Sequence, residues 1–126
     1  MILVGGAVGS LARYQLSRWV NFTTGSTFPW GTMVVNLLGA FIIGFLTGLF
    51  ERWVVSPQWR MLLIVGFLGG FTTFSTFGLE TFTLLKKSEF LPALANFALT
   101  NFLGIAFVAG GYVVAGLLIK ALKSLS

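Results

Sequence analysis

Long apolar segments separated by short polar ones dominate this sequence. A helix needs about 20 apolar residues to cross the hydrocarbon core of a bilayer, and four segments reach this length: 2–20, 31–50, 61–85 and 93–119. The segments between them, 21–29, 51–60 and 86–91, are short, which favours antiparallel packing of consecutive helices. The pattern predicts an all-α integral membrane protein with four transmembrane helices, forming a single domain over residues 1–126.

The third apolar segment is irregular at its centre. Three glycines and four hydroxyl residues lie within the ten positions 69–78, and they weaken helix propensity and offer competing local hydrogen bonds. Non-helical backbone survives at membrane depth only where protein buries it or where it lines a cavity. We therefore expect the helix to be interrupted between Gly69 and Thr76, which would free backbone carbonyls that can hold Na⁺. The alternative is a continuous helix whose glycines and threonines merely pack closely.

Small residues indicate where helices approach one another. Glycine pairs four residues apart let backbones pack closely in lipid, and three such pairs occur: Gly5 and Gly9, Gly44 and Gly48, and Gly66 and Gly70. The face of the first pair continues to Arg13, so we expect this arginine to face protein rather than lipid. Asn36 stands in the second span, where a lone amide must find partners or water.

Composition and charge narrow the function. Only 9% of the residues are charged and 56% are hydrophobic, whereas soluble domains are about 25% charged. Cysteine and histidine are absent and only three acids occur, which leaves few residues for catalysis and predicts that the chain is not an enzyme. The eight basic residues are scattered at segment ends and form no patch, so the net charge of +5 does not predict nucleic-acid binding.

The basic residues also bear on topology. One side of the membrane would hold four of them and the other three: Arg52, Arg60, Lys120 and Lys123 against Arg18, Lys86 and Lys87. A clear imbalance of Lys and Arg orients a membrane protein, and here the imbalance is almost nil. Two interpretations stay open, a single orientation decided by one or two charges and a dual topology with antiparallel pairing.

Phenylalanine recurs every third residue in the irregular segment, at Phe71, Phe74 and Phe77. Such residues would lie along one side of a helix, where aromatic side chains more often pack against protein or lipid. The edge of an aromatic ring is nevertheless positive and can meet a small, partly dehydrated anion. Rings among hydroxyl donors suit a fluoride path better than a cation path.

Three local motifs, one in each of the first three spans, carry a resemblance. They are Gly5-Gly6 to Gly9 with Arg13-Tyr14, then Gly31-Thr32 to Asn36 and Gly39, then Gly69-Gly70-Phe71-Thr72-Thr73-Phe74-Ser75-Thr76-Phe77. With these motifs in this order, the chain resembles the Fluc (CrcB-like) family of fluoride channels over essentially its whole length.

The resemblance implies a passive fluoride channel in a prokaryotic cell (inner) membrane, with fluoride, a second copy of the chain and the bilayer as partners. It implies a dual-topology antiparallel homodimer with two pores and a central structural Na⁺ held by backbone carbonyls of Gly69 and Thr72. Arg13 is expected as a structural polar residue of the first helix. The expected fluoride path comprises Asn36, Phe74, Ser75, Thr76, Phe77, Glu80 and Thr100.

The fourth span departs from the family pattern. Some members carry a line of Tyr and Ser there, whereas the corresponding stripe in this chain is Asn96, Thr100 and Gly104. Only Thr100 is therefore included in the expected path.

Two other functions compete with a fluoride channel. A small multidrug transporter also has four short spans, but it needs a carboxylate in the first span to bind cationic drugs and protons. This chain has Arg13 there instead. The other alternative is a non-transporting subunit of a larger membrane assembly.

Overall fold

Helices account for nearly all of the chain in the computed structural model, which describes residues 1–126. The all-α prediction is confirmed. The elements are α1 (Ile2–Thr24), α2 (Trp30–Arg52), α3 (Pro57–Arg60), the π-helix η1 (Met61–Leu68), α4 (Gly69–Phe71), α5 (Phe74–Lys86) and α6 (Phe90–Ser124).

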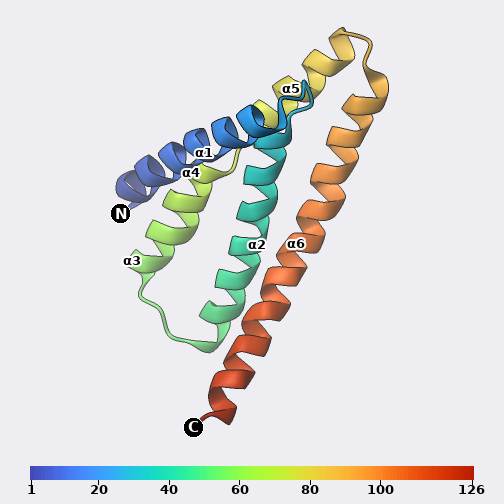
Figure 1. The fold of residues 1–126 in the computed structure, drawn as a ribbon. Helices are drawn as coiled ribbons and strands as arrows, with labels where there is room; N and C mark the ends of the chain where they lie inside the picture. The colour runs from blue at the N-terminus through green and yellow to red at the C-terminus, as the bar shows by residue number, and fades with distance from the viewer.

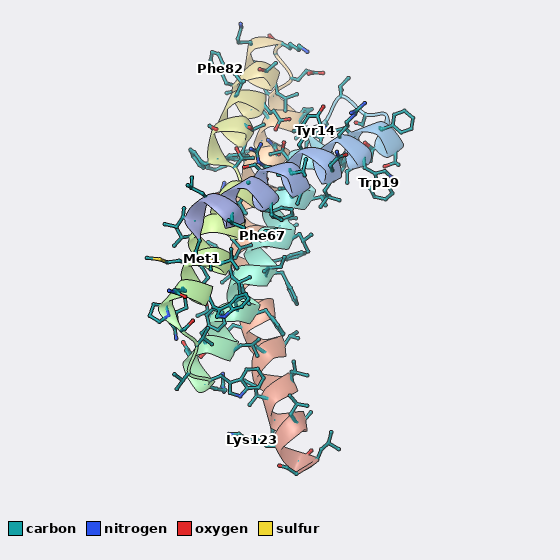
Figure 2. All side chains as sticks on the ribbon, turned by 90° about the vertical axis from the view of Figure 1, so that its left-hand side faces the viewer. Met1, Tyr14, Trp19, Phe67, Phe82 and Lys123 are labelled. Carbon is teal, nitrogen blue, oxygen red and sulfur yellow. The ribbon has the colours of Figure 1, made fainter.

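The chain runs up, down, up and down through four long stretches (Figure 1). α2 and α6 lie side by side and run in the same direction, while α3, η1 and α4 form a continuous rod that α1 crosses obliquely. Figure 2 shows the far half of α1, with Trp19, projecting away from the other helices. Within one chain this half of α1 is held only at the start of α2, where the Gly31 N–H donates to Asn21 Oδ1 at 2.9 Å, and Trp19 and Phe22 stay exposed.

Three helical stretches are long and apolar enough to cross a membrane: Trp30–Arg52, Pro57–Lys86 and Phe90–Ser124. α1 has 23 residues but is not among them, and Arg13 and Arg18 interrupt its apolar sequence. That α1 crosses the membrane as a fourth span therefore stays a prediction. Only 21 of the 126 residues are buried, so most apolar side chains face outward, as they do where lipid or another apolar surface replaces water.

Glycines bring the helix backbones together, as their spacing predicts. A methyl group at Gly44 would collide with the Val108 carbonyl, and one at Gly111 would collide with the Phe41 carbonyl. These contacts seat α2 directly on α6. α1 packs on η1 in the same way, because a methyl group at Gly9 would collide with the carbonyl of Phe67, which Figure 2 places beside α1.

The third stretch is broken where the glycine and threonine cluster predicts. Thr72 (φ −89°, ψ 157°) and Thr73 (φ −149°, ψ 120°) are extended between α4 and α5. α5 then begins with a side-chain cap, in which the Thr76 N–H donates to Thr73 Oγ1 at 3.2 Å. The alternative of one unbroken helix is wrong, and the interruption lies within the predicted interval from Gly69 to Thr76.

Adjacent glycines on α6 provide a test of the packing. Gly111→Ala should destabilise the protein by about 1–3 kcal/mol, because its methyl group overpacks the contact with α2. Gly110→Ala is the matched control: a methyl group there meets nothing within 4 Å, so the change should stay within about 1 kcal/mol of wild type. Thermal midpoints of the two variants in detergent, measured side by side, check this. Equal midpoints would contradict the proposed α2–α6 contact.

Candidate functional site

Asn36 of α2 spans the break in the third stretch. Its Nδ2 donates to the Thr73 carbonyl at 3.0 Å, and its Oδ1 accepts the Thr73 N–H at 2.8 Å. One side chain thus replaces both hydrogen bonds that the backbone N–H and C=O of Thr73 would make in a helix. Asn36, a lone amide in an apolar span, thus has its hydrogen-bond partners in the extended backbone. The second N–H of its Nδ2 makes no hydrogen bond within the chain.

The break frees particular carbonyl oxygens. In a continuous helix the Thr73 N–H would donate to the Gly69 carbonyl, and the Thr76 N–H to the Thr72 carbonyl. Here Thr73 donates to Asn36 Oδ1 and Thr76 donates to Thr73 Oγ1. The carbonyls of Gly69 and Thr72 therefore lose their helical donors, and these are the two that the resemblance assigns to Na⁺.

Arg13 satisfies another carbonyl at the end of α4. Its Nε donates to the Gly70 carbonyl at 2.9 Å, and the side chain is half-buried. Arg13 thus faces protein, as predicted. The charge-assisted hydrogen bond ties α1 to the last turn before the break.

A cavity of about 220 Å³ opens at the start of α5, lined by Asn36, Thr72, Thr73, Phe74, Phe77, Thr100 and Asn101. Four residues of the predicted fluoride path meet here: Asn36, Phe74, Phe77 and Thr100. The rings of Phe74 and Phe77 lie 5.7 Å apart, centroid to centroid, at 55°. Phe77 is buried, whereas Phe74 is 80% exposed. The buried Thr100 Oγ1 has no hydrogen-bond partner, so its hydroxyl can serve a ligand.

The other three residues of the predicted path lie elsewhere on α5. Ser75 is exposed, and Thr76 takes part in the helix cap through its backbone. Glu80, one turn further along, is half-buried beside Lys87 and Glu89 in a separate cavity of about 190 Å³. The structure does not bring these three into the cavity with Asn36.

A second cavity, of about 340 Å³, shares Asn36 and Thr72 with the first and is also lined by Gly69, Gly39 and Ala40. Gly69 is exposed here, and a methyl group on it would meet nothing within 4 Å. No group of three or more His, Cys, Asp or Glu residues that could hold a metal occurs in the structure. Backbone and hydroxyl oxygens are the available cation ligands, a donor set that suits a hard monovalent cation.

Sequence reasoning missed two residues of the first cavity. Thr73 was named as part of the glycine and hydroxyl cluster but not as a site residue, although its backbone is the partner of Asn36. Asn101 follows Thr100 but was passed over; its Nδ2 donates to the Phe97 carbonyl at 2.7 Å. A second asparagine next to an expected path residue in an apolar span was the available signal.

The sequence also matches a known protein family and named relatives. The family model described as "CrcB-like protein, Camphor Resistance (CrcB)" matches residues 1–112. Relatives named fluoride-specific ion channel FluC include those of Leptospira interrogans (45% identical over 112 residues, 88% of each chain) and Desulforapulum autotrophicum (46% over 118 residues, 93% of this chain and 94% of the relative). The Aquifex aeolicus relative is 48% identical over 114 residues, 90% of this chain and 92% of its own. The chain belongs to the CrcB-like family.

Proposed function

We propose that this chain forms a passive, fluoride-selective ion channel that exports fluoride across the cell membrane. The name of its relatives, fluoride-specific ion channel FluC, supports fluoride as the ion. The structural observation that carries the proposal is the cavity at the break, where Asn36, Phe77 and Thr100 meet. Membership in a channel family agrees with the prediction that the chain is not an enzyme.

The cavity offers what a dehydrated fluoride ion needs. A selective pore replaces the hydration shell with donors, yet binds weakly enough to release the ion. The second N–H of Asn36 and the unpartnered Thr100 hydroxyl are donors, and the edges of Phe74 and Phe77 present positive charge. Ser75, Thr76 and Glu80 would continue the path along α5, outside the cavity.

The freed carbonyls fit a structural Na⁺. Gly69 and Thr72 would hold the ion through their backbone oxygens, which lack helical donors because Thr73 and Thr76 donate elsewhere. Gly69 and Thr72 both line the cavity of about 340 Å³, which offers space for a ligand beside them. A bound cation there supplies a fixed positive charge, which in a low dielectric favours anions nearby.

The channel would assemble as a dual-topology antiparallel homodimer with two pores, each chain crossing the membrane four times with α1 as the first span. The near balance of Lys and Arg supports insertion in both orientations. The open cavity beside Gly69 and the exposed Trp19 and Phe22 on the far half of α1 are surfaces that a second copy would cover. Carbonyls from both copies would then surround one central Na⁺.

Ion flux from the purified protein in liposomes tests the function. Vesicles loaded with fluoride should release it downhill without any energy source, whereas vesicles loaded with chloride should not. A fluoride electrode and a chloride electrode measure the two rates. A small multidrug transporter or a non-transporting subunit would release neither ion, and that result would refute the proposal.

The role of the rings is tested by Phe77→Ile. This swap keeps much of the apolar volume and should cost less than about 1.5 kcal/mol in stability. It removes the ring edge, so fluoride flux should fall about tenfold. Phe82→Ile is the matched control, since Phe82 lies further along the same helix (Figure 2), is 57% exposed and does not line the cavity. Well-assembled Phe77→Ile protein with wild-type flux would exclude this ring from the path.

Dual topology is tested by charge. About three lysines added to the loop between α2 and α3 should bias insertion to one orientation and reduce fluoride flux. Co-expression with a copy biased the opposite way, through lysines in the turn between α5 and α6, should restore it. Full activity from one biased copy alone would contradict antiparallel assembly.

The cation site is tested without measuring flux. Because a ligand that binds only the folded state stabilises it, the thermal midpoint of the dimer should rise with Na⁺ concentration, at constant ionic strength kept by a bulky organic cation. Gly69→Leu fills the space beside the carbonyls and should abolish the Na⁺ dependence. Thr72→Ala keeps the backbone oxygen and should retain it. A midpoint independent of Na⁺ in the wild type would argue against the site.

A further inference from the structure

We propose that Asn96 is a positioning residue, which acts through Thr81 to hold Phe77 in place beside the cavity. The inference rests on the proposed function, because Phe77 matters here as part of the fluoride path. Asn96 belongs to the stripe that it forms with Thr100 and Gly104 in the fourth span, and it was not included in the expected path. Asn96 contacts Thr81 of α5 and not the ion path.

A chain of two hydrogen bonds joins α6 to α5. Asn96 Nδ2 donates to Thr81 Oγ1 at 2.9 Å, and Thr81 Oγ1 donates to the Phe77 carbonyl at 2.8 Å. A hydroxyl has one donor and two acceptor sites, so the Thr81 side chain can make both bonds at once. The relay therefore has one consistent direction, from the Asn96 amide to the Phe77 backbone.

The surroundings of Asn96 are dry. Its side chain is only 2% exposed, and it is one of two buried polar residues in the chain, the other being Thr32. A buried amide without its partner is costly, and hydrogen bonds in a low dielectric hold their geometry strongly. The Asn96–Thr81 bond is thus a directional tie, and it is the one side-chain hydrogen bond between α5 and α6.

α5 needs such a tie because of the break. Thr72 and Thr73 are extended, so the orientation of α5 does not follow from that of α4. The hydrogen bonds of Asn36 hold the residue before its first turn, and the Asn96–Thr81 bond holds it two turns later. Phe77 lies between the two ties, and its carbonyl accepts from the second.

Asn96 itself is not among the residues that line the cavity with Asn36 and Thr100. A direct role in ion contact therefore lacks support, whereas an indirect role through Thr81 has both hydrogen bonds. Loss of the relay should therefore lower the current that each dimer carries and leave the number of folded dimers unchanged.

The experiment compares single-channel fluoride currents in planar bilayers. Thr81→Val keeps the branched shape but removes both hydrogen bonds of the relay, and Thr81→Ser keeps the hydroxyl. Thr83→Val is the matched control, because Thr83 bonds back to the Leu79 carbonyl at 2.8 Å in the same way but has no partner on α6. We expect the unitary current to fall about fivefold in Thr81→Val and to be unchanged in Thr81→Ser and Thr83→Val.

The double variant Asn96→Leu with Thr81→Val guards against a folding defect. Replacing both partners by apolar groups leaves no buried amide unpaired and is nearly neutral for stability, so the dimer should form while the unitary current stays as low as in Thr81→Val. A normal unitary current with fewer active channels would show a merely structural role and overturn the inference. A low current in Asn96→Leu beside a normal one in Thr81→Val would overturn it too, because Asn96 would then act directly.

A second measurement does not depend on flux. With 4-fluorophenylalanine at position 77, the fluorine resonance should be single and narrow in wild type and Thr81→Ser, and broadened or multiple in Thr81→Val and the double variant. One narrow resonance at the same shift in all four proteins would refute the positioning role. This readout decides the inference even if the wild-type protein passes no fluoride, a result that would refute the proposed function alone.

Discussion

The pair of hydrogen bonds between the Asn36 amide and the backbone of Thr73 is the interaction on which the rest of this structure depends. Extended backbone inside an apolar helical layer is costly because its polar groups lack partners. Asn36 supplies a donor and an acceptor to the backbone of the same residue, Thr73, and the Thr73 hydroxyl caps the next helix. Without that side chain, restoring the helix would be the cheaper way to satisfy the Thr73 N–H.

The break lies between two cavities. Its carbonyls at Gly69 and Thr72 lie beside one cavity, and the rings that begin α5 lie beside the other. In the proposed channel the first would bind a cation and the second would pass an anion, so each favours the other electrostatically. Asn36 and Thr72 line both cavities, which makes the broken segment the common wall between them.

The packing around the break explains why it stays in register. Glycines seat α1 on η1 and α2 on α6 with backbones in contact, and Arg13 ties α1 to the Gly70 carbonyl. Close backbone packing leaves little freedom to slide. α5 lies beyond these contacts and relies on ties at Thr73 and Thr81 instead. The part of the molecule that carries the phenylalanines is thus held by hydrogen bonds more than by interdigitated glycines.

The sequence alone determined three features of this protein: its long helices, its close backbone contacts and the break in the third stretch. The apolar segments determine the long helices, the glycine spacing determines where backbones meet, and the run from Gly69 to Thr76 determines the break, since each depends on neighbouring residues. The tertiary structure decided what fills the break. Asn36 and Thr73 are 37 residues apart, and Arg13 and Gly70 are 57 apart. It also placed Ser75 and Glu80 outside the cavity, added Asn101 to it and joined Asn96 to Thr81. Such contacts depend on how each helix is rotated and tilted against its neighbours, which packing sets and local sequence pattern does not encode.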